Sequence, residues 1–270
     1  MASIPVVLAH GRAAEFEISQ TMSRLWGDAL IQGLQRVGSP YADRVQVVYA
    51  YFGGLWRPDA SGTLPIIRAA DGRRYTVELT PKPNVVEVTD LDAQAAPGLG
   101  SIAAAVAGYA PEFALEGILR QAIPDVFEYL DDFIYRTAAN NIVADACRSS
   151  GASVLVGFSM GTIVGYDVLR QVPDLAVRSF VTCGSPIGLD PIRKYLLVDD
   201  VTPFPGQLDL WLNIWNDDDV ATGVNGERLA AMFPGGSIQS ARAYGRSPSV
   251  TNAFAAHNAV DYLSSIAMGL

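Results

Sequence analysis

A serine between two glycines, where an apolar β-branched run meets a helical pattern, constrains this chain most. The stretch 154–169 reads "VLVGFSMGTIVGYDVL", and its centre is GFSMG at 157–161. The apolar run predicts a buried strand over 154–158, and the spacing after it predicts a helix over 160–171. Glycines two positions before and after Ser159 keep side chains from colliding in such a turn. The chain must therefore contain a buried strand that turns sharply into a helix.

The same alternation of strand-like and helix-like segments runs along most of the chain. It predicts an α/β fold with a mostly parallel central sheet and helices on both faces. The expected strands are 4–9, 45–52, 154–158, 179–183 and 208–215, and the expected helices are 21–37, 124–148, 160–171 and 259–268. The helix over 124–148 starts at Pro124 and is expected to carry Phe133 and Ile134 on its inner stripe. We interpret 1–57 and 123–270 as one core domain.

Residues 58–122 interrupt this alternation and are interpreted as an insertion. "IIRAADGRRYTVEL" is typical of a β-hairpin with its turn at Asp71-Gly72. "SIAAAVAGY" and "PEFALEGILRQAI" predict two short helices that would form a lid over the carboxyl edge of the sheet. The apolar residues of the insertion suit a pocket for an acyl or aromatic group, or they anchor the insertion to the core.

Composition excludes several classes of partner. The 270-residue chain has a net charge of −9, which repels phosphate backbones and makes nucleic acid a poor partner. No transmembrane segment is expected, because no apolar stretch is long enough, and the N-terminus lacks the pattern of a signal peptide. Two cysteines, Cys147 and Cys183, cannot make a disulfide framework. A cytoplasmic location is the expectation.

The chemistry of Ser159 requires a base and an acid from elsewhere in the chain. A serine hydroxyl becomes nucleophilic only beside a general base, and a carboxylate must orient that base. The chain has two histidines: His10 ends the first strand, and His257 follows the serine. Asp217, Asp218 and Asp219 follow the strand over 208–215. One of them would face the histidine, and the alternative is that the three bind calcium.

Five blocks resemble, in this order, the α/β-hydrolase fold, and especially bacterial serine esterases and lipases. They are "VVLAHGR", "VLVGFSMG", "FVTCGSPIGL", "LNIWNDDDVAT" and "AHNAVDYL". The order serine, acid, histidine that holds in this fold implies that His257 is the base. The acid in such relatives is typically followed by a valine, which favours Asp219, before Val220, and leaves Asp217 as the reserve.

The resemblance also implies an oxyanion hole. The turn after the first strand would supply the backbone N–H of Arg12, and the start of the helix after the serine would supply that of Met160. His10 would then shape the loop. Ser185 is a poor alternative nucleophile, because Pro186 follows it and no helix pattern starts there. No metal or organic cofactor is expected.

The expected function is therefore that of a serine hydrolase acting on small-molecule carboxylic esters with an apolar acyl or aromatic part. An acyltransferase, thioesterase or amidase would use the same three side chains. A non-catalytic relative that binds a ligand or partner is a third class, which the intact Ser159, His257 and aspartates argue against. The sequence indicates no oligomeric state.

Overall fold

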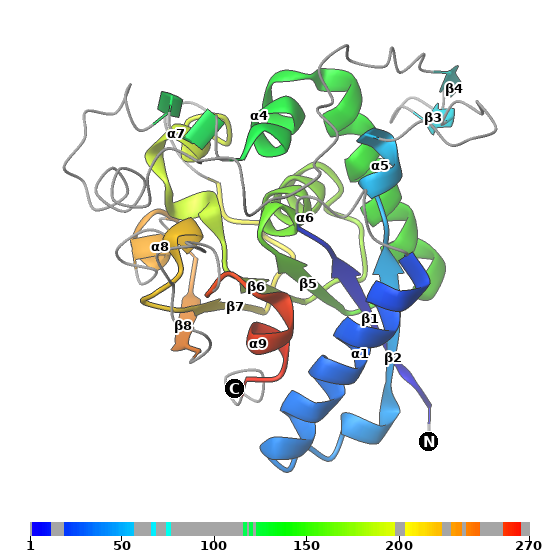
Figure 1. Cartoon of the computed structure of the whole chain (residues 1–270). Helices are drawn as coiled ribbons and strands as arrows, with labels where there is room; N and C mark the ends of the chain where they lie inside the picture. The colour runs from blue at the N-terminus through cyan, green and yellow to red at the C-terminus, as the bar shows by residue number, and fades with distance from the viewer. Residues whose placement is uncertain are drawn as a thin grey trace.

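A six-stranded parallel sheet forms the centre of the molecule (Figure 1). The computed structural model describes residues 2–11, 19–56, 66–68, 74–76, 116–117, 119–120, 123–197, 203–222, 228–233, 236–243 and 256–265. The strands are β1 (Ile4–Ala9), β2 (Val45–Ala50), β5 (Val154–Phe158), β6 (Ser179–Cys183), β7 (Leu210–Trp215) and β8 (Ile238–Arg242), in the order β2-β1-β5-β6-β7-β8. Every neighbouring pair is parallel, which confirms the α/β class and the parallel central sheet.

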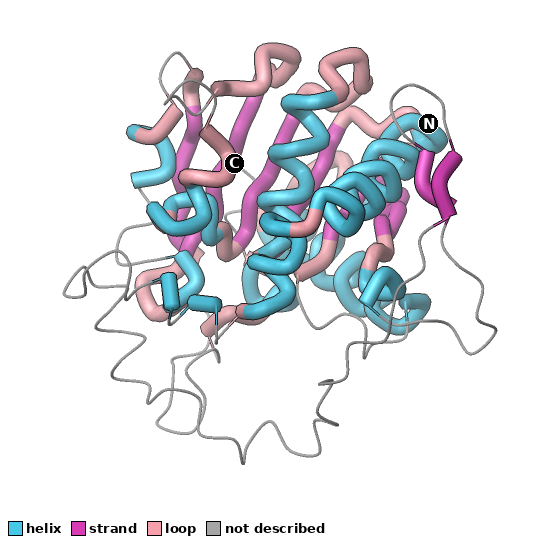
Figure 2. The backbone as a smooth tube through the Cα atoms, turned by 90° about the horizontal axis from the view of Figure 1, so that it is seen from above, coloured by secondary structure: helices cyan, strands magenta, loops and turns pink. Residues whose placement is uncertain are grey.

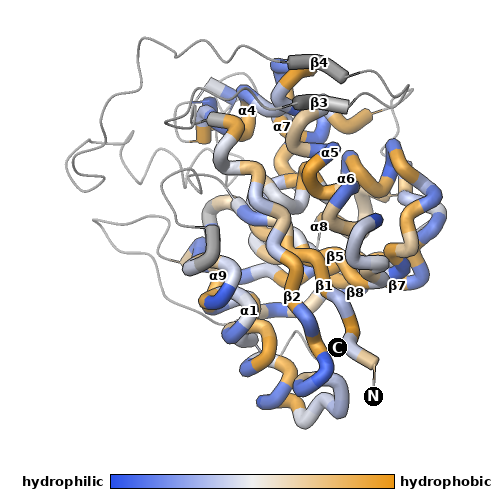
Figure 3. Tube along the Cα trace, turned by 90° about the vertical axis from the view of Figure 1, so that its right-hand side faces the viewer, coloured by the Kyte–Doolittle hydropathy of each residue, from blue (hydrophilic) through white to orange (hydrophobic). Residues whose placement is uncertain are grey.

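Alternate residues of each strand enter different cores, so the sheet is covered on both faces. Leu155 of β5 and Trp211 of β7 belong to one buried cluster, whereas Val156 and Leu212 belong to the other. This follows from the two-residue period of a strand, in which successive side chains point to opposite faces. Figure 3 shows hydrophobic colouring concentrated in these central strands. Burial on both faces explains why the strands read as continuous apolar runs.

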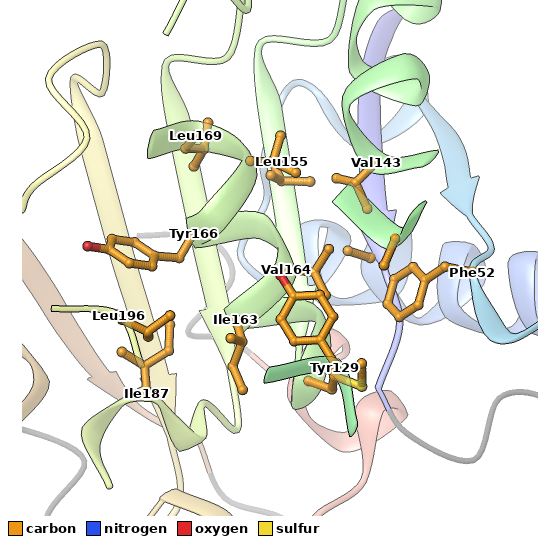
Figure 4. Packing of buried hydrophobic residues seen from close by; sticks show 14 of the residues in the cluster. Phe52, Tyr129, Val143, Leu155, Ile163, Val164, Tyr166, Leu169, Ile187 and Leu196 are labelled. Atoms are coloured by element: carbon orange, nitrogen blue, oxygen red, sulfur yellow. The ribbon is translucent and has the colours of Figure 1, made fainter. Parts of the chain in front are cut away.

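Two sets of helices cover the two faces. α4 (Pro124–Asp131), α5 (Phe133–Ser150) and α6 (Met160–Gln171) pack on one face, and α1 (Ser19–Arg36) and α9 (Ala259–Leu263) pack on the other. Figure 4 shows Val143 of α5 and Ile163 and Val164 of α6 gathered around Leu155 of β5. Figure 2 shows the helices running along the strands, an arrangement that leaves the strand ends to the loops.

The prediction of one long helix over 124–148 is wrong, because the structure has two helices there, α4 and α5. Asp132 lies between them in an extended conformation (φ −102°, ψ 108°), and its side chain accepts hydrogen bonds from the backbone N–H groups of Ile134 and Tyr135. An aspartate that caps a new helix competes with continuation of the previous one. Phe133 and Ile134 consequently lie at the exposed start of α5, with 78% and 45% of their surface accessible, and not on an inner stripe.

Other differences concern edges and short elements. The edge strand β8 was not predicted from the sequence; within the described residues it pairs with β7 alone, and it exposes much of its length. Also missed were the one-turn helices α7 (Asp190–Arg193) and α8 (Arg228–Ala231) and the 3-10 turns η2 (Ala42–Arg44), η3 (Gly53–Trp56), η5 (Pro186–Gly188) and η6 (Val220–Thr222). Both cysteines are buried and unbridged. None of the helices in the described part of the chain could span a membrane.

Only part of the insertion falls within the described residues. β3 (Ile66–Arg68) and β4 (Arg74–Thr76) pair in the antiparallel sense, Ile66 opposite Thr76, and β3 lies beside α5. The hairpin turn at Asp71-Gly72 and the helical segment expected over 101–109 lie outside the described residues. Of the segment expected over 111–123, residues 116–117 and 119–120 are described as helical. The division into core and lid therefore stays a prediction.

The strand order places a topological switch point at the carboxyl ends of β1 and β5. From β1 the chain continues to β2 on one side, and β5 pairs with β1 on the other side. At such a switch point the loops that follow the two strands diverge to opposite faces and leave room between them. The residues that follow β1 and β5 are His10-Gly11 and Ser159, so the turn of interest lies at this point.

Candidate active site

Ser159 occupies the turn between β5 and α6 in a strained conformation. Its φ is 53° and its ψ is −124°, and no other non-glycine residue among those described has a positive φ. Such backbone geometry costs of order 1–3 kcal/mol and persists only where the surroundings enforce it. Here the N–H of Ser159 donates to the carbonyl of Cys183 at the end of β6 (3.0 Å), which ties the turn to the sheet.

The glycines of the motif are required by close backbone approach. A Cβ on Gly161 would lie 2.2 Å from the carbonyl oxygen of Ala9, and one on Gly157 would lie 2.7 Å from the carbonyl oxygen of Gly161. A Cβ on Gly11 would lie 3.0 Å from the Cβ of Ser159. The start of α6 and the turn after β1 are therefore pressed together around the serine. A larger residue at Gly161 would separate them.

The backbone N–H groups at this junction suit an anion. Met160 is the first residue of α6, and the first N–H groups of a helix have no partner within the helix. These groups also carry the positive end of the helix dipole. The predicted second donor, the N–H of Arg12, lies outside the described residues, although Gly11, next to it, lies against Ser159.

Asp219 and His257 form the second part of the site. His257 Nδ1 lies 2.8 Å from Asp219 Oδ2, and the Asp219 side chain is completely buried. Burial raises the pKa of the Asp219 carboxyl, but the charge of His257 and hydrogen bonds from His257, Tyr262 and Ala221 outweigh it, so that this pKa lies below its usual value. An ionised carboxylate only accepts hydrogen bonds, so the proton of this contact belongs to Nδ1 and Nε2 faces away with its lone pair.

The structure distinguishes among the three adjacent aspartates. Asp217 is half-exposed and forms an ion pair with Arg242 of β8 (3.0 Å), and Asp218 is exposed. Only Asp219 turns inward to the imidazole, where its Oδ1 also accepts from the N–H of Ala221 (2.8 Å). The described residues hold no group of three or more His, Cys, Asp or Glu side chains arranged for a metal ion.

Phe158, the residue before Ser159, contacts the imidazole of His257. The ring of His257 stacks on the ring of Phe158 with 4.6 Å between centroids, and Phe158 directly precedes Ser159. Gly184, which follows β6, has a φ of 57° and lies beneath the pair, because a Cβ there would be 3.0 Å from His257 Cε1 and 3.1 Å from Asp219 Oδ2. The ends of β5, β6 and β7 and the start of α9 thus converge on one place.

His10 is placed differently from His257. Its Nε2 accepts hydrogen bonds from the N–H groups of Phe52 (2.9 Å) and Gly53 (3.0 Å), and its Nδ1 donates to the carbonyl of Gly11 (2.6 Å). Both ring nitrogens are therefore occupied by backbone groups. Burial lowers the pKa of His10 to about 4, so the ring is neutral near pH 7. Its geometry fits the expected loop-shaping role.

Ser185 has its own structural partners. Its Oγ lies 2.9 Å from Thr162 Oγ1 and accepts from the N–H of Ile187 (3.4 Å) as the cap of a short 3-10 turn. The hydroxyl of Thr162 in turn bonds the carbonyl of Ser159 (2.7 Å). Ser185 thus supports the start of α6 from below.

Three residues near the site were missed by the sequence analysis: Phe158, Gly184 and Tyr262. The hydroxyl of Tyr262 donates to Asp219 Oδ2 at 2.6 Å. Each of the three lies within one of the five sequence blocks, but nothing in those blocks indicates its role. That role depends on contacts between segments far apart in the chain. Tyr262 follows His257 by five residues, and only the placement of α9 brings it to the aspartate.

Together, the fold and this site define an α/β protein with a parallel sheet, a strained serine at its topological switch point and a buried Asp–His pair beside it. No protein-family model and no curated protein matches the chain.

Proposed function

We propose that this chain is a serine hydrolase of the α/β-hydrolase type, which cleaves carboxylic esters through Ser159, His257 and Asp219. The observation that carries the proposal is the strained backbone of Ser159 on a strand-to-helix turn. Strain of this kind concentrates at functional sites, and here a histidine held by a buried carboxylate lies on the neighbouring Phe158. The strand order β2-β1-β5-β6-β7-β8 is compatible with that fold.

The mechanism follows from the proton positions. Nδ1–H of His257 donates to Asp219, so Nε2 carries the lone pair and is the base that takes the proton from Ser159 Oγ as Oγ attacks the ester carbonyl. The oxyanion is stabilised by the N–H of Met160, with the N–H of Arg12 as the predicted second donor. The imidazolium then protonates the departing alkoxide and leaves an acyl-enzyme. Water attacks the acyl group, gives its proton to Nε2, and the acid is released.

The substrate part of the proposal is an ester with an apolar acyl or aromatic portion. It rests on the apolar composition of residues 58–122, most of which lie outside the described residues. A series of p-nitrophenyl esters of increasing acyl length tests it directly, because an apolar pocket gains transfer free energy with each methylene. Matched thioesters and amides distinguish an esterase from the other classes that share these side chains.

A fluorophosphonate probe tests the chemistry. We expect the wild-type chain to be labelled and Ser159→Ala to lose all labelling while Ser185→Ala keeps it. His257→Ala and Asp219→Asn should lower kcat/KM for a p-nitrophenyl ester by about 10³-fold or more. Asp218→Asn is the matched control, because its carboxylate is exposed. An unlabelled wild-type chain, or equal losses in Asp218→Asn and Asp219→Asn, would contradict the proposal.

A further inference from the structure

Two hydrogen-bond donors share one oxygen of the buried carboxylate. Asp219 Oδ2 accepts from His257 Nδ1 at 2.8 Å and from the Tyr262 hydroxyl at 2.6 Å. The other oxygen, Oδ1, accepts from the N–H of Ala221 at 2.8 Å. Tyr262 itself is 1% exposed and lies on α9. A buried protein hydroxyl therefore supplies the second bond to Oδ2.

The direction of the tyrosine hydrogen bond follows from its surroundings. The pKa of Asp219 lies below its usual value, so this carboxylate is ionised and can only accept, and the Tyr262 hydroxyl donates to it. Burial, and then the charge of Asp219, raises the pKa of Tyr262 far above its usual value, so the phenol stays neutral. A neutral phenol beside an ionised carboxylate is a donor. The hydroxyl proton of Tyr262 therefore lies on the same carboxylate oxygen that holds His257.

We propose that Tyr262 is a positioning residue that acts through Asp219 and sets the proton affinity of His257. Its hydroxyl holds Oδ2 in line with Nδ1. The hydrogen bond from this hydroxyl also takes up part of the negative charge of Asp219, so the carboxylate attracts the imidazole proton less. Less negative charge at Oδ2 stabilises the imidazolium less, so His257 keeps its free base form to lower pH. This inference rests on the proposed function only in taking His257 as the general base.

The groups that face the Asp219–His257 pair come from several elements. Tyr262 faces it from α9, the buried thiol of Cys183 from the end of β6, and the uncharged ring of Phe158 from β5. Burial raises the pKa of Cys183, so this thiol is neutral. On the loop that carries Asp219, the exposed Asp217 is paired with Arg242 of β8, and Asp218 is exposed to solvent. Among these groups, Tyr262 is the one that donates a hydrogen bond directly to the carboxylate of Asp219.

Tyr262→Phe tests the inference by removing one hydroxyl. The chain has two histidines, so NMR of ¹³C-labelled imidazoles follows each titration separately, with His257→Gln to assign the signals. We expect the titration midpoint of His257 to move to higher pH by about half a unit or more in Tyr262→Phe. The acid limb of kcat/KM should move by the same amount, with KM for the ester unchanged.

Two controls separate this role from packing. Tyr166 is also buried and donates one hydrogen bond, to the carbonyl of Pro203 (2.7 Å), so Tyr166→Phe is the matched loss of a hydroxyl away from the site. It should leave the His257 midpoint in place. In an Asp219→Asn background, Tyr262→Phe should shift the midpoint much less, because the carboxylate charge is gone.

An unchanged His257 midpoint in Tyr262→Phe, or an equal shift in Tyr166→Phe, would overturn the inference. The NMR readout does not depend on turnover, so it also separates this inference from the proposed function. A midpoint that moves as expected in a chain that neither reacts with fluorophosphonate nor hydrolyses esters would support the coupling of Tyr262 to His257 and refute the hydrolase.

Discussion

The two histidines of the chain show how the surroundings of a residue decide its chemistry. His10 has both ring nitrogens bonded to backbone groups and stacks on Phe52 with 3.7 Å between centroids. His257 has one nitrogen bonded to a carboxylate. A ring with no free nitrogen cannot exchange a proton with a substrate, whereas a ring with its Nδ1 proton bound to an anion keeps Nε2 basic. His10 therefore joins β1 to the turn after β2, and His257 is suited to proton transfer.

Because His10 is buried in its neutral form, we expect the free energy of unfolding to fall in acid. Its pKa is about 4 in the folded chain and about 6.5 when unfolded, so the unfolded state binds the extra proton between these values. The stabilisation is fully present above about pH 6.5 and is lost as the pH falls toward 4, by about 3 kcal/mol in total. Urea unfolding at pH 7.5, 6.5 and 5 measures this slope.

The variant His10→Gln provides the control for that slope. Glutamine can accept hydrogen bonds from the N–H groups of Phe52 and Gly53 but does not titrate. We expect it to be less stable than the wild type at pH 7.5 and to lose less free energy of unfolding between pH 6.5 and 5. Equal slopes for the two proteins would show that His10 does not carry this pH dependence.

At the level of elements, a buried ion cluster joins α6 to α4 and α5. Asp167 of α6 is completely buried and accepts hydrogen bonds from Arg136 Nε of α5 (2.6 Å) and from the hydroxyl of Tyr129 of α4 (2.8 Å). Arg170, one turn further along α6, also contacts it (3.2 Å). Because α6 begins directly after Ser159, this cluster holds the helix that positions the serine.

Asp167→Asn should therefore destabilise the protein by about 3 kcal/mol, because it leaves Arg136 partly buried without its counter-charge. Chemical denaturation measures the loss. Asp145→Asn is the matched control, since Asp145 forms an exposed ion pair with Arg148 on α5 and should cost about 1 kcal/mol or less. Similar costs for the two variants would mean that the buried cluster contributes no more than a surface pair.

At the level of the whole molecule, two apolar cores share one set of strands. Leu155 is buried beneath α4, α5 and α6, and Leu212 is buried beneath α1 and α9. Neither core can persist without the sheet, since each strand supplies alternate side chains to both. The two faces of the molecule are therefore expected to unfold together.

Leu155→Ala and Leu212→Ala test this coupling. Each should lower the free energy of unfolding by about 2–5 kcal/mol and shift the same transition, followed both by far-UV circular dichroism and by tryptophan fluorescence. Leu25→Ala on α1 is the control, because Leu25 is 47% exposed and its loss should change stability little. Two separate transitions, each moved by only one of the core variants, would argue for independent faces.

Local patterns were sufficient to predict much of the fold. The apolar runs at β1, β5 and β6 and the glycine spacing around Ser159 are properties of a few adjacent residues, and the structure has strands and a sharp turn at these places. The edge strand β8 was missed because its one-sided exposure leaves a weak alternating pattern. The break at Asp132 was missed because a long helical pattern outweighed a single capping residue.

Periodicity and motif spacing thus sufficed for the α/β class and for the serine turn, because both depend on interactions between near neighbours in the chain. The contact of Asp219 with His257, the pairing of Asp217 with Arg242, the backbone partners of His10 and the contact of Tyr262 with Asp219 required the folded molecule. These contacts join segments tens of residues apart, and their side-chain directions are set by sheet order and helix packing, which no local pattern records.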